Sequence, residues 1–598
     1  MLALLPLLAL ILLVRRFTLI DGLMLWGAGI ALSTELLSLV GLLDPLPVVA
    51  LWGLALLALA VAEWRAPPRE PERILPPMPL ALGVAVGAVL APTLLIVVVA
   101  PPTDWDSMAY HLPRVAHWAH NGSLAHYPTR IIRQNIYPIF AETLVLHFRL
   151  LTGGFTLANL PQWLAMLGCL LIAPRIAAEL GAGRTGQAVA VVVLAALPAG
   201  IAQATGGKND YVLALWLAVL PLAILRDEGP VRVGAALGLA ALTKPTAYIF
   251  ALPLMAWAAW RQLRDNPRRL PGYVAICAAL LLTLNAGYVA RNLANRGSPL
   301  GGGSAVATNE RLGPGVLASN VARNLAQQAA LPDPVGSWVA QAVIRGHDLF
   351  GLDATDPAAT IAMDRFRLCT DLTDEFCAPN TVHLLLGAAA FALIWAHPVL
   401  REARDAQISA AGLVAGFVLF AAALKVDPIR ARMHLPLFVL AAPLIGLAAE
   451  RLLPRRAAFA LAWVLLVLSL PWLLVNQDRP LIAVDALTDS PSILRADPVA
   501  MHFANNPALQ AVLTAAADAV EQAGCESVGL GLAHNDWEYP VWLLLGERDY
   551  RPAWDAAPLE NGRVCAILFA QEGLTALRDE PPGFALRRWG SAAVLLPE

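Results

Sequence analysis

The chain has 598 residues, of which 58% are hydrophobic and only 14% are charged. Soluble domains carry about 25% charged residues, so this composition excludes an ordinary soluble protein and indicates a helical membrane protein. The formal net charge of −2 offers no attraction to nucleic acid, and we expect no nucleic-acid partner.

Apolar runs separated by short polar loops predict a mainly α-helical, polytopic membrane protein with about 13 or 14 membrane helices. Several runs are shorter than the roughly 20 residues that span a bilayer, so their ends are approximate. In chain order, the predicted helices lie at 2–14, 17–42, 46–63, 79–100, 156–180, 187–204, 210–226, 230–243, 246–260, 271–289, 382–397, 406–424, 433–450 and 456–475.

The placement of arginine orients these helices. Short loops on one side of the predicted bundle hold arginines such as Arg65, Arg184, Arg226, Arg261 and Arg451. The positive-inside rule makes that side cytoplasmic. The outer side then receives 101–155, 205–209, the Lys244-Pro245 turn, 290–381, 425–432 and the tail after Val475.

The same patterns divide the chain into three predicted parts. Residues 1–78 form extra N-terminal membrane helices, 79–475 form the main membrane domain with outer loops 101–155 and 290–381, and 476–598 form a small extracytoplasmic α/β domain. Within that domain we expect helices at 507–523 and 538–545 and strands at 526–532 and 564–569.

Two polar segments outside the membrane have no assigned role from pattern alone. The glycine-rich GGGSAVATNERLGPG stretch (301–315) is either a lid or a plain linker. The HNDWEY segment (534–539) of the tail is a candidate recognition loop for a partner, which would make the protein a scaffold.

Four of the six cysteines lie in the predicted outer regions as two pairs, Cys369 with Cys377 and Cys525 with Cys565. Paired cysteines in extracytoplasmic segments indicate disulfides. Cys525–Cys565 is the weaker pair, because both residues flank strand-like segments. No CxxC or HxxxH spacing accompanies the cysteines, so we expect no zinc site.

Chemistry concentrates between Thr103 and Asn135, directly after a predicted membrane helix. These 33 residues hold two carboxylates (Asp104 and Asp106), four histidines, three arginines, two tyrosines and two tryptophans. Ionisable groups at a membrane boundary are costly and indicate function. The histidines are either metal ligands or hydrogen-bonded side chains; their spacing matches no known ligand set, and we expect no metal there.

The chain contains three lysines, Lys208, Lys244 and Lys425, and all three fall at predicted outer ends of membrane helices. Lysine is a compact point charge that suits phosphate. Asp210 opens a membrane helix at the same face, although a single aspartate there is often only a helix N-cap. These groups predict a site for an anionic lipid head at the outer boundary.

Five segments in order resemble the GT-C glycosyltransferases, a superfamily that includes protein O-mannosyltransferases and the aminoarabinose transferase acting on lipid A. The resemblance is carried by WDSMAYHLPR (105–114), NDYVLALWLAV (209–219), GLAALTKPTAYIF (238–250), RNLANRGSPLG (291–301) and KVDPIRARMHLPLFVLAAP (425–443). The acid that follows the family's outer-loop aspartate is replaced here by Ser107.

The resemblance implies an enzyme that transfers a sugar from a polyprenyl-phosphate donor to a glycan, lipid or protein acceptor. It places the protein in the bacterial inner membrane, with its catalytic face and C-terminal domain in the periplasm. A divalent metal is possible and no cofactor is certain. The candidate residues are Asp106 as general base with Asp104 and Asp210; Lys244, Arg291, Lys425, Arg430, Arg432 and Lys208 for the donor phosphate; and Tyr110, His111 and Arg114 for acceptor or sugar.

The main alternative is a transporter or flippase for lipid or glycan. Transporters of this kind often show internal repeats and broken helices near the membrane midplane. We find no repeat, and the polar groups gather at one face, which favours the transferase.

Overall fold

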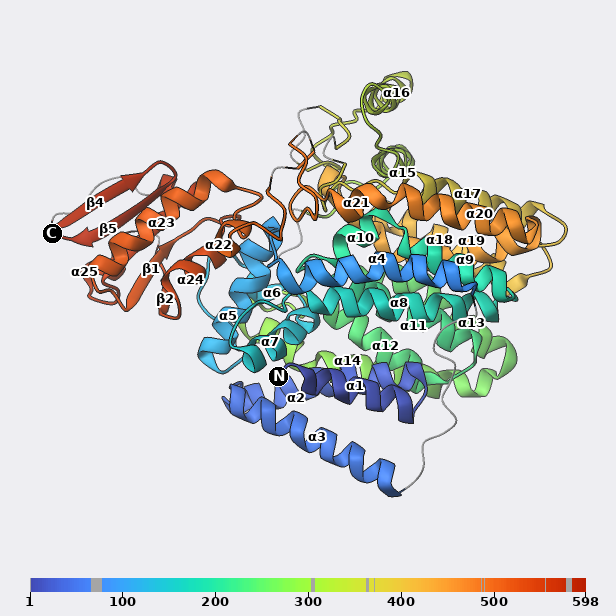
Figure 1. Cartoon of the computed structure of the whole chain (residues 1–598), viewed down its shortest axis with the longest axis horizontal. Helices are drawn as coiled ribbons and strands as arrows, with labels where there is room; N and C mark the ends of the chain where they lie inside the picture. The colour runs from blue at the N-terminus through green and yellow to red at the C-terminus, as the bar shows by residue number, and fades with distance from the viewer. Residues whose placement is uncertain are drawn as a thin grey trace.

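A computed structural model describes the chain apart from residues 1, 66–77, 303–306, 362–364, 370–371, 486, 489, 554, 556 and 577–582. A bundle of helices forms most of the molecule, and a small α/β domain lies at one end of it (Figure 1). The predicted lid or linker at 301–315 falls partly outside the described residues, as does the segment between the first and second predicted parts.

Within the described residues, eight helices are long and apolar enough to cross a membrane, or nine if the bent pair α9–α10 is one span. The chain is thus a polytopic membrane protein, as predicted. Three spans are extended by short helices, α14 by η2 (Pro267–Arg269), α19 by η4 (Pro428–His434) and α20 by α21 (Leu470–Leu474). The eight are α2 (Leu19–Leu39), α3 (Pro45–Arg65), α4 (Leu80–Val99), α8 (Leu160–Glu179), α14 (Leu270–Arg296), α18 (Arg404–Ala423), α19 (Leu435–Leu452) and α20 (Arg455–Leu468).

The other predicted membrane segments are also helical, but most are too short to count as spans. A span needs about 20 residues, and four of these helices have 13, 16, 14 and 16. They are α1 (Leu4–Arg16), α11 (Asp210–Leu225), α12 (Pro230–Thr243) and α17 (Thr381–Ala396); α9 (Arg184–Ala195), α10 (Pro198–Ala204) and α13 (Thr246–Asp265) complete the set.

Helix α11 forms the centre of the bundle. Its side chains from Asp210 to Ile224 are all buried, and it packs against α8, α12, α13 and α19. A helix that is apolar all round can lie in such a position because no face has to meet water. The burial of α11 fixes the place of Asp210, its first residue.

The outer loop 101–155 is built from short helices. They are η1 (Ser107–His111), a π-helical turn, followed by α5 (Leu112–Asn121), α6 (Arg133–Ile136) and α7 (Phe140–Thr152). The second outer loop contains α15 (Pro314–Gln328) and α16 (Val335–Leu349). Cys369 and Cys377, farther along that loop, are joined in a disulfide.

The tail forms a five-stranded sheet in the order β2-β1-β3-β5-β4. Strand β1 pairs in parallel with β2 and β3, and β5 pairs antiparallel with β3 and β4. The predicted helices and strands of this region all exist, although its boundary at residue 476 stays a prediction. The elements are α22 (Pro498–Met501), α23 (Pro507–Gln522), β1 (Ser527–Gly531), α24 (Tyr539–Leu545), β2 (Asp549–Pro552), α25 (Ala557–Glu560), β3 (Ala566–Ala570), η5 (Gln571–Ala576), β4 (Phe584–Trp589) and β5 (Ala592–Pro597).

The predicted disulfide between Cys525 and Cys565 is wrong, because both are free cysteines in the structure. The register of β1 and β3 explains the difference. The amide of Cys565 donates to the carbonyl of Ser527, and its thiol faces the same carbonyl at 3.4 Å. The strand pairing thus places Cys565 opposite Ser527, and the thiol of Cys525 lies close enough to interact with that of Cys565 without being bonded to it.

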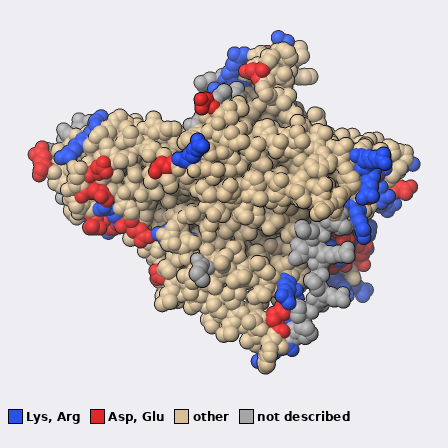
Figure 2. Space-filling model, viewed as in Figure 1, with Lys and Arg blue, Asp and Glu red and all other residues tan. Residues whose placement is uncertain are grey.

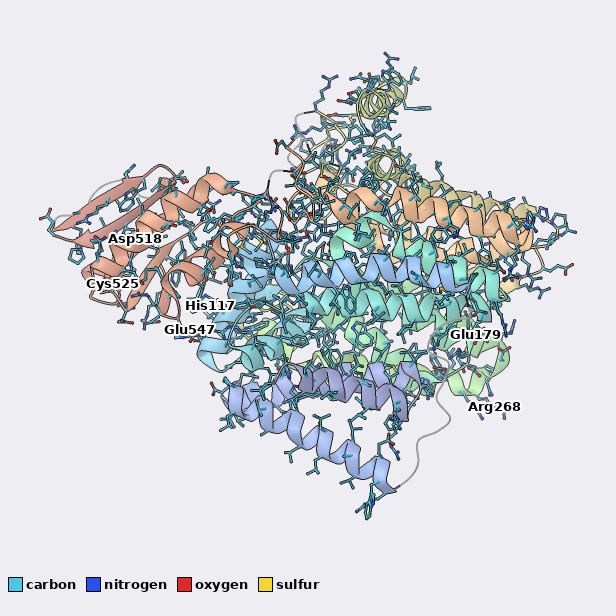
Figure 3. The ribbon with its side chains drawn as sticks, in the orientation of Figure 1. His117, Glu179, Arg268, Asp518, Cys525 and Glu547 are labelled. Carbon is cyan, nitrogen blue, oxygen red and sulfur yellow. A yellow bond between two sulfur atoms is a disulfide. The ribbon has the colours of Figure 1, made fainter. Side chains whose placement is uncertain are left out.

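Charge is distributed unevenly along the bundle. Figure 2 shows Lys and Arg gathered at the end of the bundle away from the α/β domain. Glu179 and Arg268 lie toward that end in Figure 3, whereas His117 lies at the opposite end, near Glu547 of the α/β domain. The arginine asymmetry of the sequence is therefore an asymmetry between the two ends of the folded bundle.

Candidate active site

Four predicted site residues meet at the end of the bundle nearest the α/β domain. The Arg432 guanidinium donates to the carboxylate of Asp106 through Nη2 and to Asp210 Oδ2 through Nη1, at 3.1 Å for the latter. Lys244 Nζ donates to the other oxygen of Asp210 at 2.5 Å. We call Asp106, Arg432, Asp210 and Lys244 the charge cluster; it holds two carboxylates and two cations.

Local structure explains how Lys244 and Asp210 reach the charge cluster. Pro245 disfavours helical backbone at the residue before it, so α12 ends at Thr243 and Lys244 is extended, with φ −160° and ψ 142°. Asp210 makes no capping hydrogen bond; instead Gln162 Oε1 accepts from the amides of Tyr211 and Val212 at 2.8 and 3.2 Å. The carboxylate of Asp210 is therefore available to the two cations.

Arg432 is placed by the 3-10 helix η4. The Asp427 side chain caps this helix by accepting from the amide of Ile429, and Gln328 Nε2 donates to the carbonyl of Ala431 at 2.7 Å. The guanidinium of Arg432 also lies over the ring of Phe376, 4.7 Å from its centroid. These contacts hold one arginine between two carboxylates that come from different parts of the chain.

Asp104 has a structural role that differs from that of Asp106. Its two oxygens accept from the amide and hydroxyl of Ser107, at 2.9 and 2.6 Å, in the manner of a helix N-cap. Ser107 thus closes the turn that begins the π-helical segment. Asp104 is fully buried, whereas the side chain of Asp106 is 13% exposed, so only Asp106 is accessible from outside.

The electrostatic surroundings of Asp106 favour its ionised form. Burial alone raises the pKa of this carboxyl, but the guanidiniums of Arg432 and Arg133 outweigh burial and hold the pKa well below its usual range. Arg133 Nη1 lies 3.9 Å from Asp106 Oδ1. Asp106 is consequently a carboxylate at every pH near neutrality.

Lys208 lies next to the charge cluster but is sealed in a second group of charges. Its ammonium pairs with Glu375, which also accepts from Arg479, and all three side chains are fully buried. The ring of Phe376 lies between Lys208 and Arg432, 4.0 Å from the ammonium. The structure therefore gives Lys208 an internal partner and no open face for a lipid phosphate.

Lys425 and Arg430 lie outside the charge cluster. Lys425 Nζ donates to Glu310 Oε1 at 2.6 Å and to the carbonyl of Pro357 at 2.8 Å. Arg430 donates to the carbonyl of Ala307 and pairs with Asp427 at 3.6 Å. Both cations hold the second outer loop against the end of α18.

Arg291 is also separate from the charge cluster. It makes a two-pronged ion pair with Glu35 of α2, with distances of 2.6 and 2.8 Å. A Cβ at Gly287, one turn earlier on α14, would lie 2.2 Å from the Glu35 carboxylate, so the two helices approach closely here. Arg291 joins α14 to α2, and the structure does not bring it to Asp106.

The three predicted acceptor or sugar contacts are mostly internal. His111 Nδ1 and Arg114 Nη1 both bind Glu142 Oε1, at 2.6 and 3.1 Å, and both side chains are buried. Tyr110 is buried under the guanidinium of Arg133. His111 and Arg114 therefore stabilise the outer loop, and only Tyr110 borders the charge cluster.

Several residues of the site were not predicted from the sequence. Arg133, Glu375 and Phe376 contact predicted site residues, and Arg479 pairs with Glu375. Glu375 and Phe376 directly precede Cys377, so the disulfide was a usable signal for them. Arg133 is one of three arginines in the 103–135 stretch, but no motif distinguishes it from Arg130. Arg479 comes from a polar segment without a recognisable motif, so nothing in the sequence distinguishes it from the other arginines.

No group of three or more histidine, cysteine, aspartate or glutamate side chains is placed to hold a metal ion in the part of the chain that the structure describes. The four histidines of the outer loop have other partners where the structure records them: His111 binds Glu142 and His117 binds Glu538.

An apolar groove lies inside the bundle, and no residue of the charge cluster lines it. It is enclosed by α8, α11, α13, α18 and α19, with Phe250 and Leu254 of α13 in its wall. At a rise of about 1.5 Å per residue, Phe250 lies roughly 9 Å along the chain from Lys244. The groove therefore lies deeper in the bundle than the cationic end of α12–α13.

No protein-family model and no curated protein sequence matches this chain. Solved structures of ArnT from Cupriavidus metallidurans are similar to it. The apo structure gives a TM-score of 0.51 at 15% identity, covering 86% of this chain and 97% of that chain. The structure bound to undecaprenyl phosphate gives 0.49 at the same identity and coverage.

At 15% identity the likeness to apo ArnT concerns the fold. The chain therefore shares the polytopic fold of ArnT, and the predicted fold class, a helical membrane bundle with a small C-terminal α/β domain, is confirmed.

Proposed function

We propose that the protein is a membrane glycosyltransferase that moves a sugar from a polyprenyl-phosphate donor to an extracytoplasmic acceptor. The observation that carries this proposal is the charge cluster, in which Lys244 and Arg432 stand beside Asp106 and Asp210. A lipid phosphate needs cations for its head and an apolar surface for its tail. The cluster supplies the cations next to a carboxylate able to accept a proton, and the apolar groove lies deeper in the same bundle.

The donor phosphate binds Lys244 and Arg432 in this proposal. In the structure both cations are engaged by Asp210 and Asp106, so an entering phosphate takes over part of those interactions. Guanidinium and ammonium groups make strong charge-assisted hydrogen bonds to phosphate oxygens. The same contacts stabilise the lipid phosphate as it leaves the sugar, which lowers the barrier to transfer.

Asp106 is the general base. While Arg432 is paired with it, Asp106 is ionised but only weakly basic, because its pKa is held low. When the phosphate draws Arg432 away, the basicity of Asp106 rises at the moment when an acceptor hydroxyl or amine must lose a proton. Direct attack by the acceptor on the anomeric carbon then expels the lipid phosphate and inverts that centre.

The isoprenoid tail lies in the apolar groove. Gly412 and Gly416, one turn apart on α18, leave space there, since a Cβ at Gly416 would already contact Phe250 and Leu437 at 3.6 Å. A transporter also needs a lipid groove, but it does not need a base at the phosphate. The gathering of Asp106 and Asp210 with two cations favours transfer over transport.

The charge cluster and the α/β domain lie on the periplasmic side in this proposal, in a bacterial inner membrane. Arginine-rich loops occupy the opposite end of the bundle, near Arg268 (Figure 3). The positive-inside rule assigns that end to the cytoplasm. The Cys369–Cys377 disulfide, which requires an oxidising compartment, then belongs to the periplasm.

The test uses purified protein and a panel of undecaprenyl-phosphate-linked sugars, with envelope lipids, glycans and peptides as acceptors. Undecaprenyl phosphate is the first lipid to use, because it is the ligand of the ArnT protein whose apo structure shares the fold. The readout is release of undecaprenyl phosphate with the sugar on an acceptor. Movement of the lipid-linked sugar across vesicles without release would support a flippase instead.

The decisive variant is Asp106→Asn. Loss of a general base lowers the rate by about 100-fold or more, and the amide leaves the shape of the site unchanged. Asp356→Asn is the matched control, because the salt bridge of Asp356 is with exposed Arg311 and not with a residue of the charge cluster. Equal rates in the two variants would remove Asp106 as the base.

A further inference from the structure

The 534–538 segment of the C-terminal domain lies against the turn that carries Asp106. Trp105 Nε1 donates to the carbonyl of Asn535 at 3.0 Å, and the indole of Trp105 meets that of Trp537 edge-on at 5.1 Å. On the other side of Asp106, the amide of Glu538 donates to the carbonyl of Met108 at 3.2 Å. The segment expected to recognise a partner is thus docked on the candidate active site.

Arg133 connects this segment to Asp106 directly. Its Nη2 donates to Asn535 Oδ1 at 2.7 Å and to the carbonyl of His534 at 3.1 Å. Its Nη1 lies 3.9 Å from Asp106 Oδ1, and the guanidinium lies over the ring of Tyr110. Arg133 therefore reaches the base with one nitrogen and the C-terminal domain with the other.

The segment is held rigidly by its own domain. The Asp536 carboxylate accepts from the amides of Ala533, Glu572 and Gly573 at 2.7, 3.1 and 2.8 Å. Trp537 is fully buried, and its amide donates to Gln571 Oε1. Because of these bonds, the C-terminal domain rather than the outer loop determines where Asn535 stands.

Glu538 fastens the same segment to the π-helical turn. Its buried carboxylate pairs with His117 at 2.6 Å and accepts from Gln134 Nε2 at 2.8 Å. Gln134 Nε2 also donates to the carbonyl of Ala109 at 3.0 Å. Two carbonyls of the π-helical turn are thus held by the C-terminal domain: Met108 accepts from Glu538 itself, and Ala109 accepts from Gln134, which Glu538 holds in place. Turns of this kind are frequent at functional sites.

We propose that the 534–538 segment is a positioning element of the active site, in which Asn535 orients Arg133 and Arg133 orients the carboxylate of Asp106. The proposal rests on the proposed function of Asp106 as base. The C-terminal domain then contributes to the active site, because the geometry of the base that meets the acceptor depends on both domains. Asn535 and Arg133 are positioning residues, since neither has to touch the substrate.

Other charges also act on Asp106 and must stay constant in any test. Those facing it are Arg432 from η4, Lys208 from the segment before α11, and Asp104 and His111 from its own turn. Weaker influences come from Lys244, which pairs with Asp210, and from the Arg430–Asp427 pair. All of these side chains have their recorded partners outside the 534–538 segment, so variants of Asn535 leave them in place.

The test compares Asn535→Ala with Asn505→Ala in the full-length protein. Asn505 Nδ2 donates to the carbonyl of Thr103 at 3.0 Å, so its side chain also bonds the C-terminal domain to the outer loop, but as a donor and without reaching Arg133. Asn535→Asp keeps the acceptor oxygen and serves as the conservative variant. Asn535 is exposed, so its substitution removes no buried packing.

The first readout needs no substrate. Asp106 is labelled at about pH 5 with a water-soluble carbodiimide, which reacts with protonated carboxyl groups, and quantified by peptide mass spectrometry. Because Arg133 lowers the pKa of Asp106, Asn535→Ala and Arg133→Gln should label about threefold faster than wild type, the effect of half a pKa unit. Asn505→Ala should label at the wild-type rate, and Asn535→Asp, which keeps an acceptor for Arg133, should retain more transfer activity than Asn535→Ala.

The second readout is transfer from the donor found with the sugar panel. Asn535→Ala should lower kcat about three- to tenfold with KM for the donor unchanged, and should add nothing in an Arg133→Gln background, because the two act as one unit. Wild-type labelling and kcat in Asn535→Ala, or equal losses in Asn505→Ala, would overturn the inference. If Asp106→Asn keeps full activity while Asn535→Ala alters labelling, the base assignment fails and the positioning contact stands.

Discussion

At the scale of single residues, the site is defined by how Arg432 is shared. One guanidinium binds Asp106 and Asp210 together, and Lys244 supplies a second cation to Asp210. Buried charges of this kind are costly unless each has a partner, so the cluster is stable as a neutral set of four. A donor phosphate changes the partners of both cations, and most of the residue-scale predictions follow from that exchange.

The first prediction concerns pH. In the free protein the pKa of Asp106 is depressed, so Asp106 stays ionised as pH falls until well below the ordinary aspartate value near 3.9. Once phosphate has drawn Arg432 away, that pKa rises. The acid limb of kcat, which reports the donor complex, should therefore lie at higher pH than the acid limb of kcat/KM. Coincident limbs in a rate–pH profile would contradict the exchange.

The stability of the folded state depends on pH in the same direction as activity, because both are lost as pH falls. A carboxylate with a depressed pKa stabilises the folded state at pH values above its unfolded pKa, and this contribution is lost as pH falls through the folded value. The pairing of Asp106 thus contributes fully at neutral pH and disappears only under strongly acidic conditions.

A second prediction separates the lysines. Lys244→Met should weaken undecaprenyl phosphate binding about 10- to 100-fold, the usual cost of removing a charge-assisted hydrogen bond. Lys425→Met is the matched control, because Glu310 and the Pro357 carbonyl already hold that ammonium. Binding measured by tryptophan fluorescence or calorimetry should change by less than about twofold in the control. Equal losses would place the phosphate nearer to Lys425.

At the scale of elements, Arg291 connects two helices through an ion pair. Its ion pair with Glu35 connects α14 to α2, one of the helices that precede the main membrane domain. Arg291→Met leaves the half-buried Glu35 carboxylate unpaired, so the melting temperature should fall while donor affinity stays within about twofold. A large loss of affinity with an unchanged melting temperature would indicate instead that Arg291 binds the donor phosphate.

The groove beside α18 yields another prediction at this scale. Gly416→Leu fills space between Phe250 and Leu437, so it should weaken binding of undecaprenyl phosphate and leave binding of a short-chain isoprenyl phosphate unchanged. Gly87→Leu on α4 is the control, since a Cβ at Gly87 meets nothing within 4 Å. Loss of both ligands in Gly416→Leu would show that the substitution disturbs the phosphate site itself.

At the scale of the whole molecule, the sequence predicted the helices and strands well but predicted poorly which charged side chains form ion pairs. Apolar length fixes helices, so the predicted membrane segments and the strands of the tail appear in the structure. Which cation meets which carboxylate depends on how distant segments pack. Lys208 and Arg291 looked equivalent to Lys244 in the sequence, but Glu375 and Glu35, both remote along the chain, already neutralise them.

The sequence also did not predict that the C-terminal domain docks on the outer loop. The HNDWEY segment was recognisable as polar and aromatic, which is typical of a binding surface. That its partner is the outer loop of the same chain follows only from three-dimensional contacts such as the one between Arg133 and Asn535. Membrane bundle and α/β domain thus meet at the turn that carries Asp106 (Figure 1).

The most direct test of the phosphate exchange is a structure of the protein in lipid nanodiscs with undecaprenyl phosphate bound. The phosphate should lie within hydrogen-bonding distance, about 3 Å, of both Lys244 Nζ and the Arg432 guanidinium, with Asp106 released from Arg432 and the tail in the groove beside α18. A phosphate bound at Arg291 or Lys425, with the Asp106–Arg432 pair intact, would contradict it.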